Sequence, residues 1–277
     1  MSLLDALLLG LLQGLTEFIP VSSTAHLVFA TRWLGLASRY SPEQLTAIVA
    51  VVQLGTLAAV LAFFAKDLFG IARACARPRA PESRDSLRLL GFMVAGTIPI
   101  VVLGLAFKKT IEGPWTKDLR LIAAALAAWS VILGVAERMG RRERGMEAAT
   151  ARDAWTLGFF QVFALIPGSS RSGTTLAGGL FAGLTREAAA RLSFLLSIPA
   201  VGAAGVLELH EALQVLPKSD LLMLGVATLV SAVSGYLAIG ALLRFFRTRT
   251  SWCFIAYRLL LAGLLAAMLI YGTWSPR

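Results

Sequence analysis

The chain alternates between long apolar stretches and short polar connections. A helix needs about 20 apolar residues to cross the roughly 30 Å hydrocarbon core of a membrane. Six stretches meet this length, and we expect them to be transmembrane helices: residues 44–65, 89–107, 119–137, 187–208, 220–243 and 254–274. The pattern therefore predicts an all-α integral membrane protein with a single membrane domain over residues 1–277.

Four further apolar stretches are too short to cross a membrane: residues 3–18, 24–37, 154–166 and 173–184. At 1.5 Å per residue, the first of them spans only about 24 Å. They form two pairs, and each pair is interrupted by a polar segment that begins with a proline, Pro20 or Pro167. Non-helical backbone at membrane depth is tolerated only where protein or water satisfies its polar groups. Each pair therefore predicts a re-entrant helical hairpin that returns to the side it entered from.

The two interruptions resemble each other in sequence. Residues 18–23 align with residues 165–170, and both segments contain Ile-Pro and then two serines. An acidic residue, Glu43 or Glu187, then stands at the start of the next long stretch. A hairpin followed by three spans would place a second copy upside down, so we expect an inverted-topology repeat whose two interruptions meet. The copies would cover residues of about 1–137 and 154–274.

The composition is that of a membrane protein, and it determines how the positive net charge is interpreted. Hydrophobic residues make up 57% of the chain and charged residues 15%, and the mean hydropathy is +0.74. Soluble domains contain about 25% charged residues. A formal net charge of +10 would suggest nucleic-acid binding in a soluble protein. Here the basic residues are spread over connections without a soluble module, so we expect no nucleic-acid partner.

The basic residues predict the orientation in the membrane. The connections 66–88, 138–153 and 244–253 hold 14 Lys and Arg residues, against 7 on the side of the N-terminus. Those seven are Arg32, Arg39, Lys108, Lys109, Lys117, Lys218 and Arg277. Because cytoplasmic loops are rich in Lys and Arg, we expect these three connections to be cytoplasmic and both termini to lie outside. The N-terminal segment lacks the basic start of a signal peptide, and we expect it to be retained.

Polar residues deep in apolar segments are costly and usually functional. Gln13 and Glu17 lie four positions apart, so we expect them on one face of the first short helix. Glu17 is a carboxylate well inside an apolar run beside an interruption. The alternatives are a helix–helix hydrogen bond for Gln13 and a surface position for Glu17.

The first interruption carries hydroxyls and a histidine. Ser22, Ser23 or Thr24 can cap the second short helix, whose N-terminus favours an anion. His26 lies three residues after Ser23, within reach of a serine nucleophile. The alternatives are a plain N-cap for the serines and an interfacial polar role for His26.

The second interruption is suited to bind an anion. Arg171 offers the planar fork that fits a phosphate. Gly168 and Gly173 give backbone freedom for a nest of amide groups, and we expect the next helix to start near residues 173–175. Further candidate binding groups surround Arg171: Ser169, Ser170, Ser172 and Thr174. The alternative for Arg171 is an ion pair with Glu17. The residues together predict phosphoryl chemistry at a membrane.

Two motifs of the chain resemble the signatures of one enzyme family. Residues 13–26, QGLTEFIPVSSTAH, resemble the first signature of the bacitracin-resistance type of undecaprenyl-pyrophosphate phosphatases, and residues 167–173, PGSSRSG, resemble the second. The resemblance covers essentially the whole chain. It implies a bacterial inner-membrane enzyme that removes one phosphate from undecaprenyl pyrophosphate and recycles the lipid carrier for peptidoglycan and other wall polymers. It also implies bacitracin resistance, six spans with two re-entrant hairpins, and a site that faces outside.

The resemblance further implies roles for individual residues. Glu17, Ser23, His26 and Arg171 form the expected catalytic set, and Glu17 is the candidate ligand of a divalent cation, Mg²⁺ or Ca²⁺. The expected substrate-binding residues are Gln13, Ser22, Thr24, Gly168, Ser169, Ser170, Ser172, Gly173 and Thr174. The chain departs from the family pattern at Gln13, which replaces an acidic residue, and at Ala25, which replaces a glycine.

Several alternatives stay open at this point. The nucleophile is Ser23, His26 or a water molecule. A polyprenyl-phosphate transporter or flippase could use the same inverted-repeat architecture. Runs of small residues at 123–128 and 202–205 either let helices pack closely or leave a groove for a lipid chain. A homodimer is compatible with the sequence.

Overall fold

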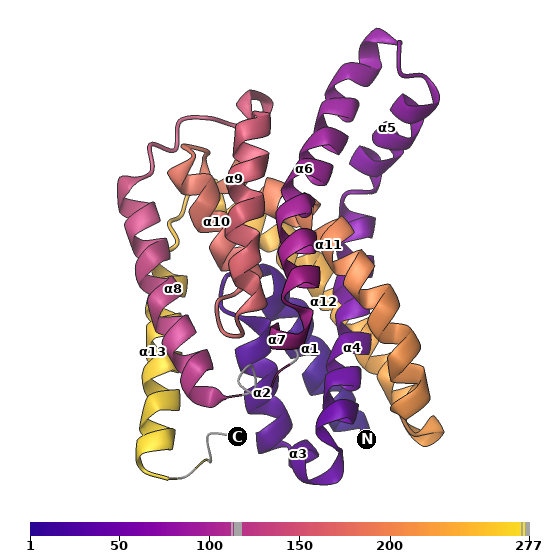
Figure 1. The fold of residues 1–277 in the computed structure, drawn as a ribbon, viewed down its shortest axis with the longest axis vertical. Coiled ribbons are helices and arrows are strands. Elements are labelled where there is room, and N and C mark those ends of the chain that lie inside the picture. The colour runs from indigo at the N-terminus through magenta and orange to yellow at the C-terminus, as the bar shows by residue number, and fades with distance from the viewer. Residues whose placement is uncertain (112, 114–117, 273, 275–277) are drawn as a thin grey trace. The chain divides into compact units, whose positions relative to one another are not determined.

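The structure is a computed structural model that describes residues 1–111, 113, 118–272 and 274. Lys117 and Arg277, two of the basic residues counted above, lie outside the described residues. Within these ranges helices are the only continuous secondary structure (Figure 1), and the one β-type contact is an isolated bridge between Arg144 and Leu184. The predicted all-α class is therefore confirmed for the described residues.

The four short apolar stretches form four short helices. They are α1 (Leu3–Phe18), α2 (Ser23–Trp33), α9 (Ala151–Val162) and α10 (Arg171–Phe181). A short 3-10 turn, η4 (Phe163–Leu165), follows α9. The interruptions at Pro20 and Pro167 fall between the members of each pair, as the sequence predicts.

All six long apolar stretches are helical. The helices are α4 (Pro42–Phe63), α6 (Arg84–Ala106), α8 (Leu119–Met139), α11 (Arg186–Val215), α12 (Leu221–Phe246) and α13 (Trp252–Ile270). Among the described residues, five helices are long and apolar enough to cross a membrane, and these contain α4, α6, α8, α12 and α13. The sixth predicted span lies on α11, where the side chains of seven residues between 204 and 213 lie outside the description.

Short helices also form in the connections. α3 (Leu36–Arg39), α7 (Lys108–Ile111), η3 (Met146–Ala148) and η5 (Lys218–Asp220) are single turns. The sequence pattern did not predict α5 (Ala65–Ala76), which fills half of the basic connection 66–88. This helix ends before Pro78, and the turn η1 (Pro81–Ser83) leads on into α6 (Figure 1).

The chain divides into two compact units that each draw on both halves of the sequence. Unit 1 comprises Met1–Phe18, His26–Gly91 and Ser197–Ala241, and unit 2 comprises Ile19–Ala25, Phe92–Leu196 and Leu242–Arg277. Both interruptions belong to unit 2. The units do not follow the boundaries of the predicted sequence repeats, which remain a prediction.

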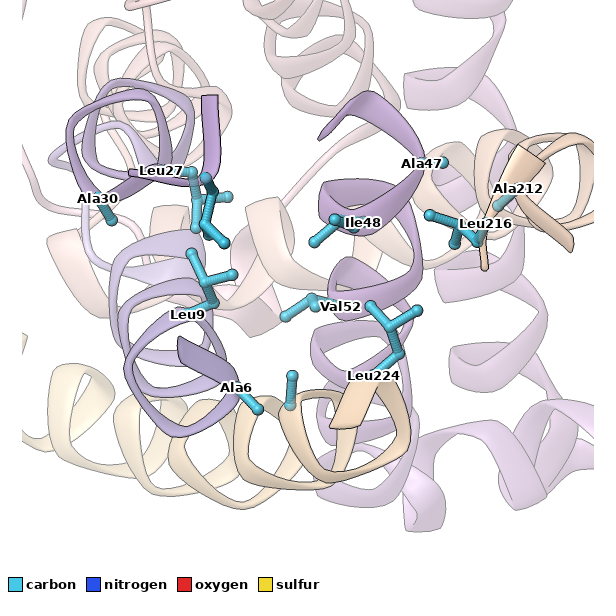
Figure 2. Close-up of a cluster of buried hydrophobic side chains, with 12 residues drawn as sticks. Ala6, Leu9, Leu27, Ala30, Ala47, Ile48, Val52, Ala212, Leu216 and Leu224 are labelled. Carbon is cyan, nitrogen blue, oxygen red and sulfur yellow. The ribbon is translucent and has the colours of Figure 1, made fainter. Parts of the chain in front are cut away.

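Unit 1 has an apolar core between α1, α2, α4, α12 and the end of α11. Figure 2 shows Leu9 of α1 and Leu27 of α2 facing Ile48 and Val52 of α4, with Leu224 of α12 beside them. Small residues bring these helices close together. A Cβ atom added at Gly14 of α1 would collide with Ser234 of α12, and one added at Gly55 of α4 would collide with Thr228. Substitution of these glycines would therefore force helices apart.

Unit 2 packs α8 against α13 and α9 against α10. Three alanines of the small-residue run 123–128, Ala123, Ala124 and Ala127, line a groove of about 590 Å³ between α8 and α13, together with Ala262 and Gly263. In unit 1 the other run packs closely at Gly205 instead, because a Cβ atom there would lie 2.7 Å from Leu54. The first run thus borders a groove and the second packs closely at Gly205, which are the two alternatives that the sequence left open.

The first helix of each pair begins in the same way. Ser2 and Asp5 at the start of α1 exchange reciprocal hydrogen bonds between side chain and backbone, and so do Thr150 and Asp153 at the start of α9. Such a capping box satisfies amide groups that the first helical turn leaves open. An arginine completes each one: Arg39 bonds Asp5 at 3.1 Å, and Arg144 bonds Asp153 through two nitrogens at 2.6 and 2.8 Å.

Candidate active site

The first interruption is a tight turn that ends on a strained serine. The amide of Val21 donates to the carbonyl of Ile19 at 2.7 Å. Ser22 has a φ of 74°, a left-handed conformation that residues other than glycine rarely adopt. Its Oγ accepts a hydrogen bond from the amide of Ala25 at 3.4 Å. Ser22 therefore caps α2, and Ser23 is the first residue of the helix.

The second interruption reaches the same cap by a longer path. Gly168 has a φ of 93° and Ser170 a φ of 69°. Ser170 Oγ accepts a hydrogen bond from the amide of Gly173 at 3.2 Å and lies 3.2 Å from Ser172 Oγ. The helix α10 therefore begins at Arg171, and the expected start near residues 173–175 is wrong. The serine cap stops the turn earlier than the glycine suggested.

The helix caps match the residues of the two interruptions differently from the sequence alignment. The alignment pairs Ser22 with Ser169, but the capping geometry pairs Ser22 with Ser170. Ser23, the expected nucleophile, then corresponds to Arg171, the expected anion clamp. The second interruption contains one residue more between its proline and its helix, and Gly168 supplies the left-handed turn that this requires.

Two glycines of the second interruption have different structural roles. A Cβ atom at Gly168 would lie 2.5 Å from the carbonyl oxygen of Ile122, so a side chain there is excluded by both space and φ. Gly173 lies inside α10 and does not contribute the expected backbone freedom. A Cβ atom at Gly173 would instead lie 2.9 Å from Nη1 of Arg258. Gly173 therefore leaves room for this arginine.

The two interruptions meet in unit 2, as the sequence predicts. Ser172 Oγ donates a hydrogen bond to the carbonyl oxygen of Ile19 at 3.2 Å. Arg258 of α13 donates to the carbonyl oxygens of Pro20 at 3.3 Å and of Ser169 at 3.0 Å. A serine and an arginine thus link the two interruptions directly.

The predicted hydroxyls of the second interruption lie in different surroundings. Ser169 and Thr174 are fully buried and Ser172 is nearly so. Ser169 Oγ has no hydrogen-bond partner among the described residues, whereas Thr174 Oγ1 donates to the carbonyl oxygen of Arg171 at 3.0 Å. Ser169 therefore keeps an open hydroxyl, and Thr174 uses its hydroxyl within its own helix.

Arg171, Ser23 and Thr24 are more accessible, whereas Ser22 is buried. Arg171 Nη1 donates to the carbonyl oxygen of Ser193 at 3.4 Å, and the arginine is half-buried. Ser23 is half-buried and Thr24 is exposed. Because α2 and α10 both begin in these interruptions, their N-terminal amide groups carry the partial positive charge that favours an anion.

Gln13 and Glu17 form a pair on α1 in unit 1. Gln13 Nε2 donates a hydrogen bond to Glu17 Oε2 at 3.0 Å, and both side chains are buried. The predicted shared helix face is therefore confirmed, and Glu17 is not a surface residue. His26 lies on α2, in the segment of unit 1 that directly follows Ala25 in the chain.

The residues offer little for a metal site made of protein alone. Among the described residues there is no group of three His, Cys, Asp or Glu side chains that could hold a metal ion. Gln13 contributes an amide where the family pattern has a second acid. Glu17 is a single carboxylate that precedes the first interruption in the chain, and it fits a cation that would take its other ligands from a bound phosphate.

Arg258 was missed at the sequence level. It lies within the apolar stretch 254–274, and an ionisable residue at that depth is itself a signal of function. Arg258 is nevertheless far in sequence from both interruptions, and its partners are mostly backbone carbonyl groups, which no sequence motif reveals.

Fold and site define a class of protein: a helical multi-pass membrane protein in which two serine-containing interruptions meet beside a buried arginine. Comparison with known proteins gives the family. The chain matches the family described as "Bacitracin resistance protein BacA" over residues 6–264 and therefore belongs to this family.

Curated relatives share the full length of the chain. An undecaprenyl-diphosphatase of Syntrophobacter fumaroxidans is 48% identical over 97% of this chain and 98% of its own length. Proteins of the same name from Myxococcus xanthus and Chlorobaculum tepidum are 45% and 44% identical over 100% of this chain. They cover 92% and 100% of their own lengths. The similarity therefore includes both interruptions and α13.

Proposed function

We propose that the protein hydrolyses undecaprenyl pyrophosphate to undecaprenyl phosphate and inorganic phosphate. The observation that carries the proposal is the meeting of the two interruptions, which brings the first residue of α2, Ser23, and the first residue of α10, Arg171, into one unit. The relatives named undecaprenyl-diphosphatase support the choice of substrate. This activity would recycle the lipid carrier for wall polymers and give bacitracin resistance.

In the proposed reaction, the positive charge of Arg171 and the N-termini of α2 and α10 bind the pyrophosphate. Ser23 Oγ attacks the terminal phosphorus, and a bond forms between them. The bond to the bridging oxygen breaks, and the lipid phosphate leaves. Water then releases inorganic phosphate from the serine.

A general base accepts the proton of the Ser23 hydroxyl in this scheme. His26, three positions further on α2, and Glu17, which precedes the first interruption in the chain, are the two candidates. Two variants of the scheme use the same residues: His26 acts as nucleophile, or a base activates water directly. Trapping the phosphorylated intermediate and locating the modified residue distinguishes the three.

The remaining predicted residues would bind the substrate. The orphan hydroxyl of Ser169 supports a role as hydrogen-bond donor to a phosphate oxygen. The cap serines Ser22 and Ser170 would hold the turns, and Gln13 would orient the carboxylate of Glu17. The groove between α8 and α13 offers apolar surface for a polyprenyl chain.

A divalent cation, Mg²⁺ or Ca²⁺, would be held by Glu17 together with phosphate oxygens of the substrate. It would offset negative charge on the pyrophosphate. We expect Glu17→Ala to lower the rate at least about 10²-fold, because loss of charge stabilisation in phosphoryl transfer is severe. Phosphate release with and without EDTA tests the cation, and full activity in EDTA would remove it from the scheme.

We further propose the membrane arrangement predicted by the sequence: six spans, two re-entrant hairpins and an inverted repeat, with both termini and the site outside the cell. The five apolar helices and the two pairs of short helices support it. Cysteine accessibility from each side of the bacterial inner membrane tests this topology. The homodimer is a separate prediction, tested by the mass of the detergent-purified protein.

Phosphate release from a polyprenyl pyrophosphate by the detergent-purified protein is the decisive experiment. A transporter or flippase with the same architecture would release none. Arg171→Ala is the matched negative control, since it removes the proposed clamp. If Arg171→Ala were as active as the wild type, the assignment of the site would be contradicted.

A further inference from the structure

Arg258 lies in α13, and its side chain is fully buried. A guanidinium at membrane depth is costly, so its partners show what it is for. We propose that Arg258 is a positioning residue, which holds the two interruptions at a fixed spacing and thereby sets the geometry between Ser23 and Arg171. This inference rests on the proposed function.

The guanidinium of Arg258 donates hydrogen bonds to both interruptions and to α8, all in unit 2. Its Nη1 donates to Pro20 of the first interruption at 3.3 Å. Its Nη2 donates to the carbonyl oxygens of Gly168 and Ser169 in the second interruption, at 3.4 and 3.0 Å. The accepting carbonyl groups lie two or three residues before Ser23 and Arg171. A shift of the guanidinium therefore moves the starts of both helices.

The helix α8 fixes the opposite side of the guanidinium. Arg258 Nε donates to Ser130 Oγ at 3.0 Å, and Ser130 Oγ donates in turn to the carbonyl oxygen of Leu126 at 2.5 Å. Leu126 also accepts from Arg258 Nη2 at 3.5 Å. The arginine is thus held from α8 while it holds the two interruptions.

An arginine suits this place better than a lysine. All the acceptors are neutral oxygens, and Arg258 makes no ion pair with any described residue. A planar guanidinium directs five N–H groups in fixed directions, whereas an ammonium is a point with three. Gly173 leaves space for the guanidinium, since a Cβ atom there would lie 2.9 Å from Nη1.

The bonds of Arg258 to protein oxygens separate its role from that of Arg171. Because Nε, Nη1 and Nη2 each donate to backbone carbonyl groups or to Ser130, Arg258 acts on the reaction through the interruptions. A misplacement of about 1 Å between reacting groups can cost about 10²-fold in rate. Loss of a positioning residue should therefore lower kcat and leave KM nearly unchanged.

The test compares Arg258→Met, Arg258→Lys and Ser130→Ala in the full-length protein, purified in detergent. Arg88→Met is the matched control, because Arg88 is an exposed arginine in unit 1. We expect Arg258→Met to lower kcat about 10²-fold with KM within about threefold of the wild type. Arg258→Lys should recover part of kcat, and Ser130→Ala should lose severalfold in kcat, with no further loss when combined with Arg258→Met.

A second measurement does not depend on activity. Hydrogen exchange of the peptides that contain residues 19–25 and 168–175 reports the order of the two interruptions. We expect both peptides to lose protection together in Arg258→Met, and to a lesser degree in Arg258→Lys, while peptides from α4 keep theirs. If Arg258→Met does not fold, the kinetics and the hydrogen exchange of Arg258→Lys and Ser130→Ala test the inference instead.

The results separate this inference from the proposed function. An unchanged kcat in the variants, or exchange that increases in neither or only one of the two peptides, overturns the positioning role. So does a lower melting temperature with unchanged kcat per folded molecule. A wild type that releases no phosphate contradicts the proposed function instead, and hydrogen exchange then still decides whether Arg258 holds both interruptions.

Discussion

The first interruption places Ser22 at a φ of 74° before α2, and the second places Ser170 at a φ of 69° before α10. Each serine caps its helix through Oγ. The next residue differs: it is Ser23 in the first interruption and Arg171 in the second. The same backbone device thus presents a hydroxyl at one helix start and a guanidinium at the other.

This difference shows how two similar helix starts present different chemical groups. A left-handed residue other than glycine costs roughly 1–3 kcal/mol, and such strain clusters at functional sites. Both strained serines are held by the packing of unit 2, where the interruptions contact each other. The proposed nucleophile and the proposed anion clamp then come from equivalent positions, so a division of labour between them can be tested residue by residue.

The largest effect is expected at Ser23. Ser23→Ala removes the proposed nucleophile and should lower the rate of phosphate release at least about 10³-fold. The melting temperature should stay close to that of the wild type, because Ser22 and not Ser23 caps the helix. Ser38→Ala, at an exposed serine of α3, is the matched control. A Ser23→Ala protein with a labelled phosphohistidine would move the nucleophile to His26.

The equivalent change in the second interruption is Arg171→Ala. It should cost at least about 10²-fold in rate, because charge stabilisation dominates phosphoryl transfer. Arg171→Lys should lose less, since it keeps the charge without the planar fork. The ratio kcat/KM for each variant provides the measurement. Equal activity of Arg171→Ala and the wild type would leave the second interruption without its proposed role.

The longer path of the second interruption leads to a prediction for Gly168. Gly168→Ala places a Cβ atom 2.5 Å from the carbonyl oxygen of Ile122 at a φ of 93°. We expect a loss of about 1–3 kcal/mol in unfolding free energy and about tenfold in activity. Gly91→Ala is the control, because nothing lies within 4 Å of a Cβ atom there. A Gly168→Ala protein as stable as the wild type would show that the turn tolerates another conformation.

Several parts of this comparison were predictable from the sequence. The short helices follow from stretches too short to span, and the interruptions follow from Pro20 and Pro167. The helix α10 starts earlier than Gly173 indicates, because the cap formed by Ser170 sets its boundary. The pairing of Ser23 with Arg171 needs backbone torsions, which residue identity does not give.

Other features depend on contacts between distant segments. Arg258 bonds carbonyl oxygens of Pro20 and Ser169, and no side-chain pattern announces a backbone acceptor. The helix α5 lies in a basic connection. The charges of this connection indicate the orientation in the membrane, but they do not indicate a helix. The catalytic roles and the cation come from the family resemblance and remain predictions.

The smallest expected effect concerns the two capping boxes that lead into the interruptions. Burial alone would raise the pKa of Asp153, but the hydrogen bonds from Arg144 and Thr150 outweigh it and hold the pKa below the ordinary value. Burial likewise opposes the bonds from Ser2 and Arg39 that lower the pKa of Asp5. Each carboxylate therefore stabilises the fold above its ordinary pKa of about 3.9, and this contribution is lost as the pH falls through the lowered value.

Asp153→Asn should cost about 1–3 kcal/mol at pH 7, because it leaves the donors of Arg144 without a charged acceptor. Asp5→Asn should cost no more than about 1 kcal/mol, since its partner Arg39 is 45% exposed and solvent screens the pair. Melting temperatures between pH 7 and about pH 2 measure both, and the difference between variant and wild type should stay constant down to about pH 4 and shrink below it. A larger loss for Asp5→Asn would reverse the ranking and make the entry to the first interruption the more tightly anchored of the two.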